Sequence, residues 1–232
     1  MISVCLAAYN GERFIRRQLE SILPQLGPGD EVIVSDDGST DQTLAVVRSL
    51  NDPRIRIVRN TGRRGPVGNF ENALNQVRGE FIFLSDQDDV WLPDKVHRLR
   101  PLLETHNLVL SDCTVVDAGG RTLFPSFFAH RGSRPGLLRN LYKNSYVGCC
   151  MAFRRSLLKR ALPFPKGLYM HDWWLGLLAE AGGSVCFYPE STLLYVRHGQ
   201  NASPTSEGSL GWVDRILNRW GLIRSLGVRL LT

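Results

Sequence analysis

The sequence predicts an α/β fold built on a mainly parallel central sheet. Short apolar segments alternate with segments of helical length from the amino terminus to about residue 85, and this alternation is typical of βαβ units. Polar or acidic clusters follow several of the apolar segments, where ligands collect in open α/β sheets. The chain has 232 residues, of which 43% are hydrophobic. That is enough for one complete core, and we expect one domain with appendages.

Four apolar runs are predicted as the strands of the first half, at residues 2–8, 31–35, 55–59 and 80–85. The segments between them predict helices that begin near residues 12, 39 and 67. Ser39 and Gln42 have the spacing of a capping box, so we expect Ser39 to cap the second of these helices. This order predicts parallel strands that are joined by helical connections.

The second half has a less regular pattern. Strands are expected near residues 108–110, 185–188 and 192–196, and helices near 155–161 and at 171–181. The last segment, residues 210–231, carries aromatic and aliphatic residues among arginines and predicts an amphipathic helix. Two interpretations of that helix stay open. It lies on an anionic membrane surface, or it docks on the protein's own core or at a subunit contact.

An acidic cluster follows the fourth predicted strand. Asp86, Asp88 and Asp89 come directly after the apolar run at residues 81–84. Carboxylate oxygens at the end of a strand suit Mg²⁺ or Mn²⁺, and Mg²⁺ usually binds through one or two carboxylates together with substrate phosphates. The alternative is an acidic turn whose short side chains bond their own backbone.

Charge and cysteine usage narrow the class of protein. The formal net charge is +6 and the pI is about 9.3, which favours a polyanionic ligand. A nucleotide diphosphate is sufficient, and we expect no nucleic-acid partner because no basic stripe with interleaved aromatic residues occurs. The five cysteines show no metal or disulfide spacing and predict reduced thiols in a cytoplasmic protein. We expect no signal peptide and no membrane span, because no apolar run approaches roughly 18 residues.

Four segments, taken in order, resemble the family 2 inverting glycosyltransferases of the GT-A fold: AAYNGE at residues 7–12, VSDDGSTD at 34–41, SDQDD at 85–89 and HDWW at 171–174. The likeness extends to about Asn201. With RHGQN at 197–201, the set is most similar to bacterial rhamnosyltransferases of surface-polysaccharide synthesis. It implies a Rossmann-like sheet in a catalytic domain at 1–207, with a nucleotide-binding half at 1–111, an acceptor-binding half at 112–207, and the amphipathic segment at 208–232.

The resemblance implies a nucleotide site on the first two loops and the acidic cluster. It places Ala8 and Tyr9 beside the base, Glu12 at the mouth of the first loop, and Asp86 on the ribose. Asp36 would accept a hydrogen bond from a base N–H, and such a contact selects uracil or thymine. The segment around Asp36 is also a turn and a helix cap, so a structural role for it stays open.

The diphosphate and its metal are assigned to three further segments. Residues 60–65 form a basic loop with two glycines that leads into a helix, and such helix starts favour anions. Arg63 is expected at the phosphates, although a solvated loop charge is the alternative, and Asn69 is expected to face the nucleotide from the following helix. The resemblance assigns Asp88 and His198 to Mn²⁺ or Mg²⁺, and imidazole is a ligand that Mn²⁺ accepts.

The general base is expected at Asp172. In the family, the aspartate at this place deprotonates the acceptor hydroxyl, which then attacks the anomeric carbon and inverts it. The alternative role of Asp172 is to cap a helix. Trp173 and Trp174 are expected to form a wall for the acceptor sugar, unless one of them belongs to the core.

These residues together predict a metal-dependent inverting glycosyltransferase. The expected donor is a dTDP- or UDP-sugar, most similar to dTDP-L-rhamnose, and the expected acceptor is a glycan or a lipid-linked glycan of the bacterial surface. The enzyme would be cytoplasmic, at the inner face of the plasma membrane if residues 210–231 bind that surface. The alternatives are a UDP-hexose-dependent transferase, a sugar-phosphate nucleotidyltransferase and an inactive glycan-binding module.

Overall fold

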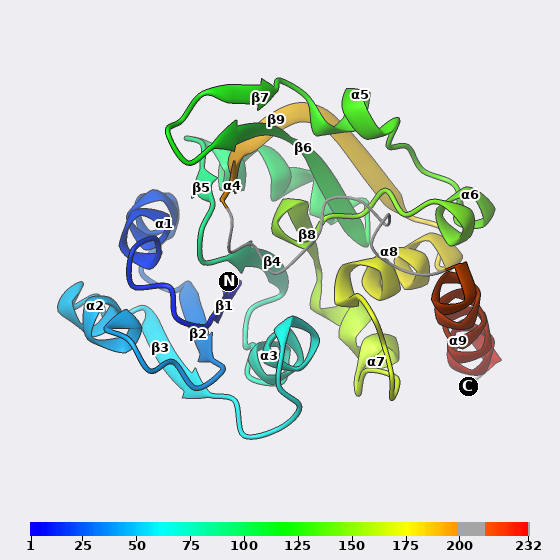
Figure 1. Ribbon diagram of the computed structural model, residues 1–232, viewed down its shortest axis with the longest axis horizontal. Helices are drawn as coiled ribbons and strands as arrows, with labels where there is room; N and C mark the ends of the chain where they lie inside the picture. The colour runs from blue at the N-terminus through cyan, green and yellow to red at the C-terminus, as the bar shows by residue number, and fades with distance from the viewer. Residues whose placement is uncertain (199–211, 232) are drawn as a thin grey trace.

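The computed structural model describes residues 1–198 and 212–231, and in the last helix the side chains of residues 218–230. The predicted motif at 199–201 and the predicted boundary at 207 lie outside the described residues. Within these residues nine strands form one sheet, whose arrangement Figure 1 shows: β1 Ile2–Ala8, β2 Glu31–Asp36, β3 Ile55–Arg59, β4 Phe81–Asp86, β5 Val90–Trp91, β6 Leu108–Asp117, β7 Thr122–Phe124, β8 Met151–Arg154 and β9 Val185–Arg197.

The α-helices are α1 Ile15–Ile22, α2 Thr43–Ser49, α3 Pro66–Leu74, α4 Lys95–Leu99, α5 Phe127–Arg131, α6 Leu137–Tyr142, α7 Leu158–Ala161, α8 His171–Ala181 and α9 Trp212–Leu231. Four 3₁₀ turns complete the described elements: Leu23–Gln25, Pro101–Glu104, Gly148–Cys150 and Arg155–Leu157. In Figure 1, α1 and α2 lie at the end of the molecule opposite α9.

The strand order is β3-β2-β1-β4-β8-β6-β9-β5, and β7 pairs with β6. The first four strands are parallel, and β8 is antiparallel to both of its neighbours. Ala8 is level with Asp36 across β1 and β2, and Ala7 is level with Asp86 across β1 and β4. The carboxyl ends of three strands therefore meet at one edge of the sheet, where the sequence places its polar clusters.

The mainly parallel α/β architecture is confirmed, with two local differences. The predicted capping box is wrong, because α2 begins at Thr43 with no side-chain cap, and Ser39 Oγ accepts a hydrogen bond from Asn10 N instead. The two strands expected at 185–188 and 192–196 form one strand, β9, which pairs with β6 across register shifts near Asp112. The expected border between the two halves at residue 111 falls inside β6.

The predicted C-terminal helix is present and packs partly on the protein. Leu222 and Leu226 are buried in the main hydrophobic core, and α9 contacts α6, α7 and α8. On its other side Trp220 is 67% exposed and Val228 is 56% exposed. Docking of one face is therefore confirmed, while a second apolar face remains in contact with solvent. Within the described residues, no helix has both the length and the apolarity that a membrane crossing requires.

Candidate active site

The acidic loop is joined to the loop after β1 by one side chain. Gln87 Oε1 accepts a hydrogen bond from Tyr9 N at 2.9 Å, and Gln87 Nε2 donates to Tyr9 O at 2.9 Å. Gly11 allows this approach, since a Cβ added there would lie 2.1 Å from Gln87 Oε1. Gln87 therefore fixes the spacing between the predicted base-binding loop and Asp86, the last residue of β4.

Asp88 and His198 lie side by side, although they are far apart in the sequence. His198 Nε2 is 2.8 Å from Asp88 Oδ2, and the imidazole stacks on Phe14 with 4.5 Å between ring centroids. His198 directly follows β9, while Asp88 precedes β5, the strand that pairs with β9. A carboxylate oxygen and an imidazole nitrogen in this arrangement are a donor set that suits Mn²⁺.

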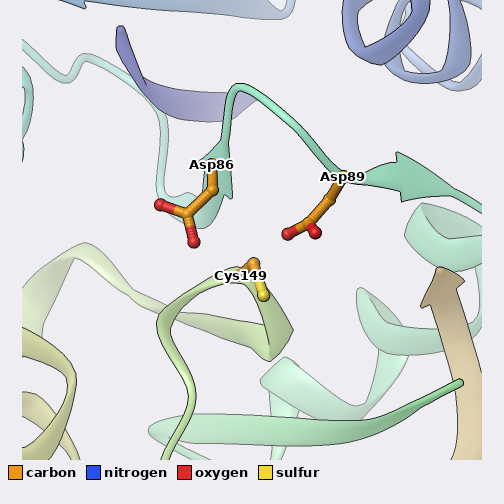
Figure 2. Close-up of side chains that lie close together, drawn as sticks. All are labelled: Asp86, Asp89 and Cys149. Carbon is orange, nitrogen blue, oxygen red and sulfur yellow. The ribbon is translucent and has the colours of Figure 1, made fainter. Parts of the chain in front are cut away.

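The carboxylates of Asp86 and Asp89 extend from the acidic loop toward the segment that carries Cys149 (Figure 2), and the ligand atoms of the three residues all lie within 4.8 Å of one another. Asp89 is buried; its Oδ1 accepts a hydrogen bond from Val196 N at 3.1 Å, and its Oδ2 has no hydrogen-bond partner among the described residues. Burial, followed by the charges of Asp88 and Asp172, raises the pKa of Asp86 to about 7. Burial and the same acidic cluster also raise the pKa of Asp89. A divalent cation beside these carboxylates would relieve their repulsion.

A buried lysine lies behind this cluster, and sequence reasoning missed it. Lys95 is fully buried, its Nζ donates to Cys149 O at 2.7 Å, and it lies 4.6 Å from the centroid of the Trp91 ring. Burial lowers the pKa of Lys95, and its charge acts against the rise in the pKa of Asp86. Its position at the start of a short helix gives no signal that the side chain turns inward.

The first two loops are held by acidic side chains that bond backbone N–H groups. The carboxylate of Asp36 accepts hydrogen bonds from Gly38 N and Ser39 N, each at 3.1 Å, and Asp36 is 3% exposed. Glu12 Oε2 accepts from Gln42 N at 2.9 Å at the start of α2. Asp36 therefore performs the turn-capping role that the sequence left open, and its contact with a base stays a prediction.

The side chain of Tyr9, which is predicted to lie beside the base, is more exposed to solvent than that of Asp36. Tyr9, which follows the end of β1, is 54% exposed. Ala8, the last residue of β1, is buried and offers its backbone, because its carbonyl oxygen accepts hydrogen bonds from Asp37 N at 2.9 Å and Asn69 Nδ2 at 3.1 Å. These hydrogen bonds hold the end of β1 in place, and Tyr9 follows directly after it.

The basic loop at 60–65 is fixed at both ends. Asp37 accepts hydrogen bonds from Asn60 Nδ2 at 2.7 Å and from Gly65 N at 2.8 Å, which orders the loop directly before α3. Arg63 Nη2 donates to Leu168 O at 2.9 Å, so this arginine links the loop to the segment before α8. Gly68 lets α3 approach the loop, since an added Cβ would lie 1.8 Å from Arg63 O.

Asn69 is buried and ties two strand ends together. Its Oδ1 accepts from Ser35 Oγ at 2.6 Å, and its Nδ2 donates to Ala8 O at 3.1 Å. Both polar groups of the side chain are therefore engaged at the ends of β1 and β2. The expected contact of Asn69 with the nucleotide stays a prediction, and the observed contacts give it a positioning role.

Asp172 is the second residue of α8 and is buried. Its Oδ1 accepts a hydrogen bond from Trp173 N at 2.7 Å. Burial raises the pKa of Asp172 to about 6, although hydrogen bonds with the backbone of Trp173 and Gly148 act in the opposite direction. The charge of Asp172 acts on Asp86, which brings the predicted base into the electrostatic environment of the acidic loop. A carboxylate with this pKa is suited to accept a proton near neutral pH.

His171, beside Asp172, is a second polar residue that sequence reasoning missed. It is buried, stacks on Phe70 with 4.2 Å between ring centroids, and its Nε2 has no partner among the described residues. Burial lowers the pKa of His171 to about 3, so the ring is neutral. A Cβ added at Gly148 would lie 3.1 Å from His171 Nε2. Gly148 therefore lets the chain pass close to this ring.

Both tryptophans of the motif lie in the core. Trp173 Nε1 donates to Asn140 O at 2.7 Å, and Trp174 Nε1 donates to Ala161 O at 3.1 Å. Trp173 is 5% exposed and Trp174 is fully buried. The alternative of a core position therefore applies to both rings in this structure, and an acceptor contact for either stays a prediction.

Comparison with known proteins shows which family and which relatives this chain resembles. The family model described as glycosyl transferase family 2 matches residues 3–162. The succinoglycan biosynthesis protein ExoO of Rhizobium meliloti is 36% identical, with 85% of this chain and 61% of ExoO covered. The dTDP-rhamnosyl transferase RfbG of Shigella flexneri is 28% identical, with 93% of this chain and 80% of RfbG covered.

The fold is also found in a solved structure. The crystal structure of S. aureus TarS 1-349 in complex with UDP-GlcNAc has a TM-score of 0.73 and 23% identity, and it covers 100% of this chain and 66% of the TarS chain. This likeness confirms the predicted GT-A fold. The chain spans about three fifths of the length of ExoO. Because the family model covers the first four strands, the acidic loop and the basic loop, the chain belongs to glycosyl transferase family 2.

Proposed function

We propose that this chain is a metal-dependent inverting glycosyltransferase that moves a sugar from a nucleotide diphosphate to a hydroxyl of a growing bacterial surface glycan. The observation that carries the proposal is the pairing of Asp88 with His198 at 2.8 Å, beside the ends of the strands that carry the nucleotide loops. Membership of glycosyl transferase family 2 supports the same reaction class.

The residues take separate roles in this reaction. Asp88 and His198 would hold Mn²⁺ or Mg²⁺, which supplies Lewis-acid stabilisation of the departing diphosphate. The donor set fits such an ion. Buried Asp89, the next residue in the chain, has an unpartnered Oδ2, and its ligand atom groups with those of Asp86 and Cys149. Asp86 binds the ribose, Arg63 neutralises phosphate charge, and Gln87 keeps the two nucleotide loops at a fixed spacing.

Asp172 performs the proton transfer. Its carboxylate accepts the proton of the acceptor hydroxyl while the hydroxyl oxygen forms a bond to the anomeric carbon. The bond between that carbon and the diphosphate oxygen breaks on the opposite face, so the configuration inverts. Burial holds the pKa of Asp172 at about 6, which makes it a stronger base than an exposed aspartate but leaves it ionised at neutral pH.

The donor is proposed to be a pyrimidine nucleotide sugar, with dTDP-L-rhamnose as first choice. Its support is the HDWW motif and the 28% identity to the dTDP-rhamnosyl transferase RfbG. The alternative is a UDP-hexose, and the fold of TarS in complex with UDP-GlcNAc is compatible with it. Purified protein with Mn²⁺ should have a higher melting temperature with the correct donor, since a ligand that binds the folded state stabilises it.

A donor panel tests both the reaction and the donor. We expect dTDP-L-rhamnose to raise the melting temperature more than UDP-glucose, UDP-GlcNAc or GDP-mannose, and to release dTDP when acceptor is present. Greater stabilisation by a UDP-sugar would replace rhamnose and keep the transferase. A panel that yields neither stabilisation nor nucleotide release would contradict the proposed function.

The acceptor is proposed to be lipid-linked, with the protein at the membrane surface. The solvent-facing side of α9 supports this, because Trp220 is 67% exposed beside the exposed Ile223 and Arg224. Apolar residues flanked by arginines bind anionic bilayers. The protein should sediment with phosphatidylglycerol vesicles and Trp220→Ser should reduce that binding, whereas equal recovery of both proteins would contradict the membrane contact.

A further inference from the structure

A groove lies between α9 and the segment that connects α7 to α8. Its volume is about 380 Å³. One wall is residues 165–169, and the other is the side of α9 that carries Leu222, Arg224 and Val228. The groove is separate from the acidic loop and from the nucleotide-binding edge, because none of those residues lines it.

The lining is cationic and partly apolar. Lys166, Arg224 and Arg229 line the groove, and among the described residues no aspartate or glutamate does. Arg229 is fixed by the carbonyl oxygens of Leu162 at 3.3 Å and Pro163 at 2.6 Å. Lys166 and Arg224 are exposed, and no hydrogen bond or ion pair of either occurs within the described residues. Their charges are therefore available to an anion.

The polar and apolar groups of the lining are arranged for an amphiphile. Tyr169 and Ser225 add hydroxyl groups, while Val228 on α9 and the ring of Tyr169 supply an exposed apolar surface. A phosphate group pairs well with the two exposed cations. A hydrocarbon chain that replaced water on Val228, which is 56% exposed, and on the ring of Tyr169 would gain about 25 cal/mol for each Å² of apolar surface buried.

The surrounding sequence strengthens the positive potential. Between Asp117 and Asp172 the chain contains ten lysines and arginines and no acidic residue. Such a one-signed region attracts anionic ligands over distances of about 10 Å at moderate salt. Glu71, whose Oε1 accepts a hydrogen bond from Phe164 N at 2.6 Å, lies next to this segment but is not among the described residues that line the groove.

The groove also lies directly before the proposed base in the chain. Residues 165–169 run into Met170, whose carbonyl oxygen accepts from Trp174 N in the first turn of α8, where Asp172 lies. On the other side, Leu168 O accepts from Arg63 Nη2 of the basic loop. A ligand in the groove is thus connected through one short segment to both the base and the donor loop.

We propose that this groove binds the phosphate-bearing lipid end of the acceptor, with a diphosphate against Lys166 and Arg224 and the prenyl chain along Val228 and the ring of Tyr169. The proposal deepens the proposed function, on which it rests for the existence of a lipid-linked acceptor. It gives the chemical class of the ligand as a polyprenyl diphosphate, and it makes α9 part of the acceptor site.

Calorimetric titration with farnesyl diphosphate, a short and water-soluble polyprenyl diphosphate, tests the groove. Saturating UDP and Mn²⁺ keep the probe out of the donor site. We expect the double variant Lys166→Ala/Arg224→Ala to raise Kd at least tenfold, and inorganic diphosphate to bind the wild-type protein at least tenfold more weakly than farnesyl diphosphate. The double variant Lys159→Ala/Arg160→Ala removes the same charge from exposed positions on α7 outside the groove and should bind as the wild type does.

The charge-preserving variant Lys166→Arg/Arg224→Lys should keep binding, which separates loss of contact from misfolding. Equal affinities of the two alanine variants, failure of wild type to bind, or equal affinity for inorganic diphosphate would overturn the proposal. The proposal would also be overturned if Lys166→Ala/Arg224→Ala lost binding to phosphatidylglycerol vesicles but kept the wild-type affinity for farnesyl diphosphate. That result would make the groove a membrane contact. Because the titration needs no turnover, a protein that binds the probe but transfers no sugar would contradict the proposed function and not the groove.

Discussion

Replacement of Asp172 with asparagine is expected to lower kcat by roughly 10²- to 10⁴-fold, which is the usual worth of a positioned general base. Donor binding should be unchanged, because Asp172 acts on the acceptor hydroxyl. The amide cannot accept the proton, while its size and its hydrogen bond from Trp173 N are retained. Sugar transfer measured beside the donor Kd separates the two effects.

Asp94→Asn is the matched control for this variant. Asp94 is exposed and has φ +68°, a conformation that asparagine tolerates well, so turnover should be unchanged. Normal turnover of Asp172→Asn would assign the base to another group.

The pH profile gives an independent check of the role of Asp172. Since burial raises the pKa of Asp172 to about 6, the protonated, inactive form persists to that pH. At saturating donor and Mn²⁺, where the pH dependence of donor binding through Asp86 does not limit the rate, the wild-type rate should rise with pH through about 6, and the rate of the variant should not.

Replacement of Asp88 with alanine is expected to abolish metal-dependent donor binding and to lower kcat/KM by a factor on the order of 10² or more. The reason is that Lewis-acid stabilisation of a leaving group is worth several kcal/mol, and each tenfold change in rate corresponds to about 1.36 kcal/mol. His198→Ala should act in the same direction, because its Nε2 lies 2.8 Å from Asp88 Oδ2. Titration of nucleotide diphosphate with and without Mn²⁺ measures the effect.

His97→Ala provides the control for the histidine, since His97 is exposed on α4 and should leave the Mn²⁺ response intact. An Asp88→Ala protein that kept the wild-type Mn²⁺ dependence would contradict the metal role. A loss confined to kcat, with donor affinity unchanged, would mean that the ion stabilises the transition state and does not contribute to donor binding.

The strands could be predicted from sequence because their apolar runs are bounded by polar turns. The runs at 2–8 and 55–59 coincide with β1 and β3. The start of α2 could not be predicted in the same way, because several acidic side chains compete for one loop. The carboxylate of Asp36 accepts a hydrogen bond from Ser39 N, and Asp41 Oδ1 accepts one from Thr43 N at 3.0 Å, so the helix begins at Thr43. A local spacing rule does not include such competition.

The site was predictable to the extent that its residues lie at strand ends. Asp86 ends β4 at the predicted edge, and the expected meeting of Asp88 with His198 is present in the structure. The inward turn of Lys95 and the unpartnered His171 depend on segments that are remote in the sequence, since Lys95 bonds the carbonyl of Cys149. Tertiary packing alone decides which side of a short helix is covered.

The position of β9 in the sheet has a consequence for the order in which the protein matures during synthesis. β5, which follows the acidic loop, has its described pairing with β9, and His198 reaches Asp88 from 110 residues further along the chain. Amino-terminal segments leave the ribosome first, so the strands that carry the nucleotide loops emerge long before β9. A nascent chain that ends before residue 198 would therefore carry the nucleotide loops without the second proposed metal ligand, and cation binding would mark the addition of β9 to the sheet.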